Sequence, residues 1–148
     1  MWVELTDLPI DPARAREFVG GDPRFGGIVT FDGVTRAEHD DAHGALSYLE
    51  YEAYDDMASV QIRRLVARAM ESWPVGRVVV LHRTGVVKPG EVAVIISVAC
   101  EHRAQAFEAC RFLIDTLKAE VPIWKKDVFE DGFTRWVDPT QHGKSRTT

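Results

Sequence analysis

Three lysines lie close together in the segment KAEVPIWKK, which runs from Lys118 to Lys126. Lys118 lies near the expected end of a helix, where the helix dipole stabilises a cation, and this structural role alone explains a surface lysine. The alternative is chemical. The apolar run Val121–Trp124 lies between Lys118 and Lys125, and such surroundings can desolvate an ammonium group and lower its pKa. Either lysine could then act as an acid, a base or a nucleophile.

Other basic residues lie elsewhere in the chain. His102 and Arg103 begin the same expected helix, whose N-terminus favours anions, although on sequence alone a capping histidine and a solvated arginine are the preferred explanation. Arg36 opens a polar loop, and Arg135 precedes Trp136, on which it could stack. Together these cations suit a pocket for a ligand that carries phosphate or carboxylate, with the reacting nucleophile supplied from elsewhere.

Other chemical patterns are weak. His39 and His43 flank two aspartates, but loose spacing of this kind is typical of a solvated loop, and we expect no metal site. Cys100 and Cys110 form no metal-binding spacing, so we interpret them as buried thiols. The motifs of nucleophile elbows, phosphate-binding loops and dinucleotide-binding folds are absent from the sequence. We also expect no cofactor.

Length and charge narrow the class of protein. The chain has 148 residues, which predicts one domain over residues 1–148. Its net charge of −5 disfavours binding to nucleic acid. No apolar run approaches the ~20 residues of a membrane span, and no signal peptide is visible. We therefore expect a cytoplasmic protein with both thiols reduced.

Hydrophobic periodicity predicts the order βαββαββαββ. The expected strands are Met1–Thr6, Phe25–Thr35, Ala45–Glu52, Arg77–Val87, Val92–Cys100, Ile123–Phe129 and Phe133–Val137, and the expected helices are 12–19, Asp55–Trp73 and Arg103–Glu120. We expect Met1–Thr6 at a sheet edge, Ala45–Glu52 paired with Phe25–Thr35, and Val92–Cys100, which is apolar on both faces, in the centre. Residues 36–44 should form a loop, and the polar tail from Asp138 should be flexible.

The two long helices carry broad apolar stripes at helical spacing. The expected buried positions are Met57, Val60, Ile62, Leu65, Val66, Ala69 and Trp73 in one helix, and Phe107, Cys110, Leu113, Ile114, Leu117 and Val121 in and just after the other. Hairpin-joined strands with helices between them predict an α+β fold rather than a wound parallel sheet. Both helices should cover one face of a mainly antiparallel sheet.

Four segments together resemble the large, catalytic subunit of molybdopterin synthase, the MoaE family. The segments are Leu49–Ala58, Leu81–Glu91, His102–Ala109 and Leu113–Lys126, within a resemblance that runs roughly from Phe25 to Val137. The resemblance implies a hammerhead-type α+β fold with a small extra antiparallel sheet. It also implies a sulfurtransferase that converts precursor Z, a cyclic pyranopterin monophosphate, into molybdopterin.

In this family, sulfur arrives as a thiocarboxylate on the C-terminal Gly-Gly tail of a small ubiquitin-like subunit. Two large subunits form a homodimer, and one small subunit on each gives a heterotetramer. The family's paired functional lysines fall on Lys118 and Lys125. Its anion-binding positions match Arg36, His102 and Arg103, while Arg135 and Lys126 are further substrate-binding candidates. The resemblance explains why a sulfur-transferring chain needs no reactive thiol of its own.

The alternative function is a non-catalytic module that captures an extended C-terminal tail by strand addition. An exposed sheet edge near Ile123–Phe129 would provide the docking site.

Overall fold

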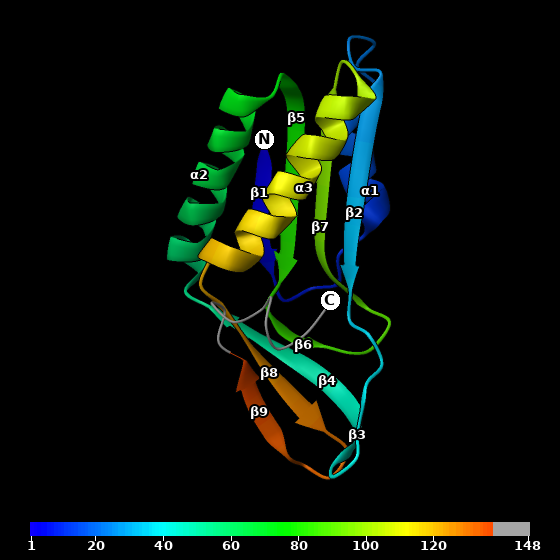
Figure 1. Ribbon diagram of the computed structural model, residues 1–148, viewed down its shortest axis with the longest axis vertical. Coiled ribbons are helices and arrows are strands. Elements are labelled where there is room, and N and C mark those ends of the chain that lie inside the picture. Colours follow the sequence, from blue (N-terminus) through cyan, green and yellow to red (C-terminus); the bar gives the residue numbers. More distant parts are fainter. Residues whose placement is uncertain (138–148) are drawn as a thin grey trace.

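A computed structural model describes residues 1–137 of the chain (Figure 1). The tail predicted from Asp138 lies outside the described residues. In chain order the elements are β1 (Trp2–Thr6), α1 (Pro12–Val19), β2 (Gly27–Val34), β3 (His39–Asp40), β4 (Gly44–Ala53), α2 (Asp55–Ser72), β5 (Val75–Arg83), β6 (Gly85–Val87), β7 (Val92–Cys100), α3 (Arg103–Glu120), β8 (Ile123–Phe129) and β9 (Thr134–Val137).

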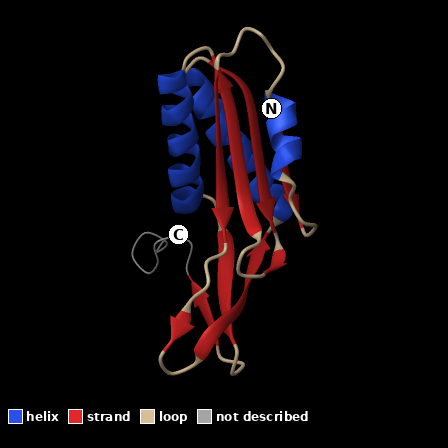
Figure 2. Ribbon diagram, turned by 90° about the vertical axis from the view of Figure 1, so that its right-hand side faces the viewer, coloured by secondary structure: helices blue, strands red, loops and turns tan. Residues whose placement is uncertain are grey.

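The upper part of the molecule is a four-stranded sheet in the order β1-β5-β7-β2, with helices on both of its faces (Figure 2). We call this sheet and its three helices the body. β1 runs parallel to β5 at the edge, and the other pairs are antiparallel. β7 lies between β5 and β2, which confirms the predicted central position of Val92–Cys100. The α+β class is likewise confirmed.

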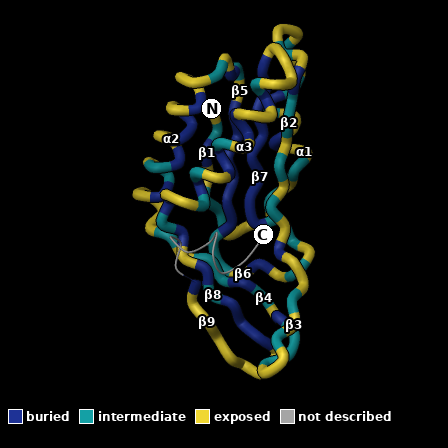
Figure 3. Tube along the Cα trace, in the orientation of Figure 1, coloured by how far each residue is buried: buried dark blue, intermediate teal, exposed yellow. Residues whose placement is uncertain are grey.

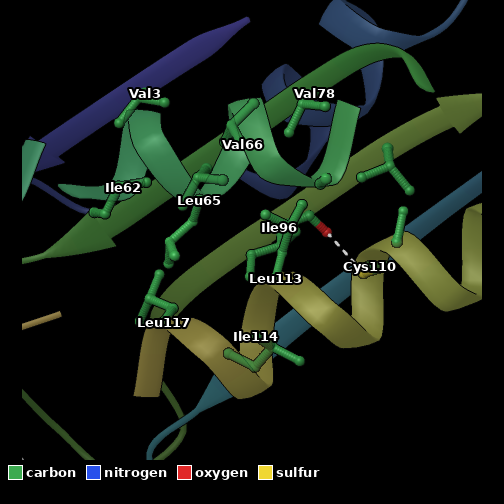
Figure 4. Close-up of a cluster of buried hydrophobic side chains, with 14 of the residues drawn as sticks. Val3, Ile62, Leu65, Val66, Val78, Ile96, Cys110, Leu113, Ile114 and Leu117 are labelled. Carbon is green, nitrogen blue, oxygen red and sulfur yellow. Dashed lines mark hydrogen bonds between the residues drawn. The ribbon is translucent and has the colours of Figure 1, made fainter. Parts of the chain in front are cut away.

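The largest apolar cluster lies between the sheet and the two long helices (Figure 4). It contains Ile62, Leu65 and Val66 of α2, Leu113 and Leu117 of α3, and Val78 and Ile96 of the sheet. A smaller cluster packs α1 against the opposite sheet face through Ala15 and Val19. Both long helices therefore cover one face, as predicted. Their apolar stripes place them there, because each presents its buried residues at intervals of three and four positions.

Three residues expected in these stripes are exposed instead. Met57, Val60 and Phe107 have exposed fractions of 53%, 47% and 63%. The buried positions of each helix form a narrower stripe than predicted, running through Ala58 and Ile62 in α2 and through Ala106 and Cys110 in α3. The three exposed residues lie beside these stripes rather than within them.

A second sheet extends below the body in the order β3-β4-β8-β9, with β6 pairing β4 (Figure 1). We call it the distal sheet. The predicted pairing of Ala45–Glu52 with Phe25–Thr35 is wrong: β4 pairs with β8 and β6, whereas β2 pairs with β7. Alternation identifies the buried face of a strand but not its partner. The segment after β2 carries the chain out of the body before β4 begins.

Three further predictions need correction. The predicted strand Arg77–Val87 is divided into β5 and β6, because Gly85 has a φ of 77° and the chain turns there into the distal sheet. The predicted exposed edge at Ile123–Phe129 is covered: β8 pairs with β4 on one side and, from Lys125 to Val128, with β9 on the other. The predicted loop over residues 36–44 contains the two-residue strand β3.

Burial differs between the two parts of the chain (Figure 3). β5 and β7 are buried along nearly their whole length, whereas β9 is exposed at three of its four positions. Within residues 1–137, no helix combines the length and apolar composition needed to span a membrane.

Candidate active site

A cavity of about 210 Å³ lies where the body meets the distal sheet. Its walls come from the end of β2, from β4, β5 and β7, from the last turns of α3, and from β8 with the residue Val121 that precedes it. Lys118 and Lys125 both line it, together with the apolar side chains of Val121 and Ile123. Of the predicted apolar wall, Val121 and Ile123 are therefore beside the lysines, whereas Pro122 and Trp124 do not line the cavity. The fold brings both ammonium groups to one enclosed space.

Lys118 occupies the last turn of α3 and is half-buried. Burial is the main cause that lowers the pKa of Lys118, and the nearby positive charge of Arg36 lowers it further. The carboxylate of Asp115 acts in the opposite direction. At neutral pH, Lys118 therefore gives up its proton more readily than a lysine in water, as a proton-transfer role requires.

Lys125 is buried, with an exposed fraction of 4%. It follows Trp124 in β8, where successive side chains point to opposite faces of the sheet, so that Ile123 and Lys125 face the cavity while Trp124 does not line it. In the β4–β8 ladder Lys125 lies directly opposite Tyr51, which also lines the cavity. The β4–β8 register therefore brings the buried Lys125 and the aromatic Tyr51 to the lining of the same cavity.

Thr35 and Arg36 follow the end of β2, and of the two only Thr35 lines the cavity. Arg36 is exposed and forms an ion pair of 3.2 Å with Glu38, and its charge acts on Lys118. Thr35 lines the cavity with an exposed fraction of 3%, and its hydroxyl has no hydrogen-bond partner among the described residues. A buried hydroxyl of this kind favours a polar ligand, because leaving it unpaired costs free energy.

Comparison with known proteins identifies the family. Residues 5–120 match the family described as MoaE protein. The chain belongs to the MoaE family. A molybdopterin synthase catalytic subunit from Thermoplasma volcanium is 42% identical over 135 residues, which cover 91% of this chain and 96% of that protein. The corresponding human subunit is 42% identical over 112 residues, or 76% of this chain and 58% of that protein.

Solved structures agree with this assignment. A molybdopterin synthase from Staphylococcus aureus superposes with a TM-score of 0.84 at 34% identity, over 90% of this chain and 95% of that one. A complex of subunits 1 and 2 of the molybdopterin-converting factor from Helicobacter pylori contains a chain with the same fold, with a TM-score of 0.71 at 19% identity. That chain is covered over 92% of its length, and this one over 98%.

Two residues that the MoaE resemblance places in the site lie far from the cavity. His102 and Arg103 begin α3, whose last turn carries Lys118. Since a helix rises ~1.5 Å per residue, its 18 residues separate the two ends by roughly 27 Å. Both side chains are exposed, and His102 lies 3.4 Å from Glu101. Within one MoaE chain they do not meet the lysines.

Lys126 and Arg135 also lie outside the cavity lining and have acidic partners. Lys126 pairs with Glu50 at 2.8 Å and lies over the Trp136 ring, and the hydrogen bond to Glu50 raises the pKa of Lys126. Arg135 pairs at 3.0 Å with Asp127, whose side chain is fully buried. These contacts hold β4, β8 and β9 together, which gives both cations a structural role.

The cavity also contains polar groups that the sequence analysis did not single out. His82 and Tyr51 line it, as does Thr35. His82 directly follows the buried apolar run Val78–Leu81 of β5, and a titratable residue at the end of such a run is the signal that could have identified it.

Neither cysteine contributes to the cavity lining. Burial raises the pKa of the Cys110 thiol to about 11 and also raises that of Cys100. The Cys110 thiol lies 3.8 Å from the carbonyl oxygen of Ile96, to which it donates a weak hydrogen bond (Figure 4). Among residues 1–137, no group of histidine, cysteine and acidic side chains has the arrangement of a metal site.

Proposed function

We propose that this chain is the catalytic subunit of a molybdopterin synthase, which transfers sulfur from the C-terminal thiocarboxylate of a small ubiquitin-like subunit to precursor Z and so forms the dithiolene of molybdopterin. Membership of the MoaE family supports the proposal. The observation that carries it is the meeting of Lys118 and Lys125 in one cavity. The thiocarboxylate and the phosphate of the substrate are both anions, and this cavity offers them cations.

In the proposed reaction each cavity residue has a separate role. The buried ammonium of Lys125 stabilises negative charge that develops on the thiocarboxylate carbonyl, because electrostatic stabilisation is strong where water is excluded. Lys118, with its lowered pKa, exchanges a proton with the substrate. Arg36 and Thr35 bind the substrate next to the end of β2. The attacking sulfur belongs to the partner, so the chain supplies no nucleophile.

A small partner subunit and a second copy of this chain complete the proposed assembly. In Helicobacter pylori, two subunits of the molybdopterin-converting factor form a complex. His102 and Arg103 are exposed at the end of α3 remote from the cavity of their own chain, so they can bind substrate only at a cavity of another copy. We therefore propose a homodimer in which this pair completes the cavity of the neighbouring subunit.

Reconstitution tests this function directly. The protein is mixed with a thiocarboxylated partner and precursor Z, and the dithiolene product is measured. Product should form with the wild-type protein and should be lost with Lys118→Ala, because removal of a half-buried lysine leaves the fold intact but removes the proton-transfer group. Lys118→Arg should not restore activity, since a guanidinium stays charged.

Lys88→Ala is the matched control, because Lys88 is exposed and does not line the cavity. Its activity should equal that of the wild type. Absence of product from the wild-type protein, with donor and substrate both verified, would refute the proposal. Tail binding without turnover, unaffected by changes at Lys118 or Lys125, would instead favour a binding module.

A further inference from the structure

One titratable group of the cavity has no part in the mechanism described above. His82 of β5 lines the cavity and is buried, with an exposed fraction of 5%. Its Nδ1 lies 2.7 Å from the carbonyl oxygen of Arg83. A carbonyl oxygen can only accept a hydrogen bond, so Nδ1 carries the proton and donates it. In the neutral ring, Nε2 is therefore the nitrogen with a lone pair that can accept a proton.

A second contact orients the imidazole. The ring of Tyr51 meets the ring of His82 edge to face, with centroids 5.1 Å apart and planes at 81°. Tyr51 is also the cross-strand neighbour of Lys125. Imidazole, phenol and ammonium thus come from three strands, β5, β4 and β8, to one cavity wall. The hydrogen bond to Arg83 and the contact with Tyr51 together fix the tautomer and the plane of the His82 ring.

We propose that His82 is a further proton-transfer residue of the sulfur transfer, acting on the water that releases the partner's tail. This inference depends on the proposed function. Attack of the thiocarboxylate sulfur on a substrate carbon forms a carbon–sulfur bond as a carbon–oxygen bond at that carbon breaks. The departing oxygen takes a proton from Lys118, and a thioester then joins the tail to the substrate. Water must then attack the thioester carbonyl before the partner can leave. His82 takes a proton from that water as the new carbon–oxygen bond forms.

Both protons of the attacking water are accounted for in the release step. When the carbon–sulfur bond of the tail breaks, the protonated imidazole returns its proton to the departing sulfur, which stays on the substrate. The tail leaves as a carboxylic acid and loses its remaining proton to solvent. The other titratable groups that line the cavity are Asp32 of β2, Tyr51 of β4, Lys118 of α3 and Lys125 of β8. In the proposed reaction Lys118 acts on the substrate and Lys125 on the carbonyl oxygen, and Asp32 is exposed. His82 is therefore the buried nitrogen base that is left to act on the water.

The test replaces His82 with Asn, which keeps an N–H donor for the Arg83 carbonyl but removes the basic nitrogen. Product release in a single turnover should slow by about 100-fold or more, as expected for loss of a general base. The dissociation constant for precursor Z should change less than about threefold. Intact mass spectrometry should show a covalent adduct of partner and substrate that the wild type does not accumulate. His39→Asn, which changes an exposed histidine outside the cavity lining, is the matched control and should behave as wild type.

The outcomes separate this inference from the proposed function. An inactive wild-type protein would overturn the function itself. Two outcomes with an active wild type would overturn the role of His82 alone. In one, the His82→Asn protein releases product at the wild-type rate. In the other, its activity falls only because it binds precursor Z more weakly. His82→Gln provides a second variant if the first does not fold. Failure of both to fold would assign His82 a structural role and would equally overturn the inference.

Discussion

The body and the distal sheet are stabilised by different interactions. The main cluster of the body contains 21 buried residues, whereas the distal sheet has a cluster of three, Leu46, Leu49 and Phe129. Polar pairs take the place of apolar packing there: the ion pairs of Lys126 with Glu50 and of Arg135 with Asp127, and the hydrogen bond between His43 and Asp131. The cavity lined by Lys118 and Lys125 lies at the boundary of these two regions.

The comparison shows how the chain can place buried cations without disrupting its main core. Burying a charge costs free energy unless it is compensated, and the apolar body offers few compensating groups. The distal sheet supplies polar neighbours, and β8 presents Lys125 from that side. The comparison predicts that the body sets global stability, while the distal sheet responds to changes in charge.

The largest effect should come from a cavity in the body. Ile96 of β7 is fully buried, and Ile96→Ala should lower the free energy of unfolding by about 4 kcal/mol, since buried methylene groups are lost and the space is not refilled. Leu46→Ala in the distal sheet is the matched variant and should cost less. Urea unfolding measures both. Equal losses would contradict the difference between the two regions.

Removal of an ion-pair partner in the distal sheet should have a smaller effect. Arg135→Ala leaves the fully buried Asp127 carboxylate without that guanidinium, at a cost of about 2 kcal/mol because Arg135 is itself half-exposed. Hydrogen exchange should speed up in β8 and β9 but not in β7. Arg24→Ala, which removes an exposed pair with Asp22, should leave exchange unchanged. Uniform acceleration throughout the body would argue against a separately stabilised distal sheet.

Lys118 should lower the stability of the fold while being required for sulfur transfer. Because its pKa in the folded protein lies below 10.5, the unfolded chain holds this proton more tightly, so the charged form destabilises the fold. Lys118→Met should therefore raise the melting temperature at neutral pH and abolish sulfur transfer. The gain should shrink as the pH rises towards 10.5, where the unfolded lysine also loses its charge. Lys88→Met is the exposed control, and an equal gain there would show that burial is not the cause.

The smallest effect is expected at the tip of the distal sheet. His43 lies 2.8 Å from Asp131 and stacks on Phe133, and this hydrogen bond is the main cause that lowers the pKa of Asp131 below 3.8. The pair should therefore support the fold above pH 3.8 and lose its effect as Asp131 protonates at lower pH. His43→Gln should raise the pKa of Asp131, measured by NMR titration of its carboxyl group. An unchanged titration would exclude the pairing in solution.

Much of the body could be predicted from sequence. Proline and glycine identify the helix ends: Pro12 begins α1, Gly20 ends it, and Pro122 follows α3. The partners of β4 could not be predicted, because alternation is the same whether a strand pairs with β2 or with β8. The division at Gly85 does not follow from the sequence, because Thr84 and Val86 on either side of it are β-branched and favour a continuous strand.

The candidate site was predictable in part, for a related reason. Lys118 and Lys125 are seven positions apart, so local sequence can suggest that they meet. His82 and Tyr51 are distant in the chain and reach the cavity through pairings that the sequence does not reveal. His102 and Arg103 are separated from Lys118 by the full length of α3, and only an assembly of chains could unite them.

The burial of both thiols prevents a side reaction with the partner's acyl group. A thioester near a reactive cysteine is open to capture by that cysteine, because a thiolate exchanges with thioesters faster than water attacks them. Cys110, with a pKa of about 11, and Cys100 stay protonated and enclosed, so neither can divert an acyl group that enters with a partner. The same enclosure shields both sulfur atoms from peroxides and alkylating agents. The two cysteine sulfur atoms of this chain therefore take no part in the transfer of the partner's sulfur.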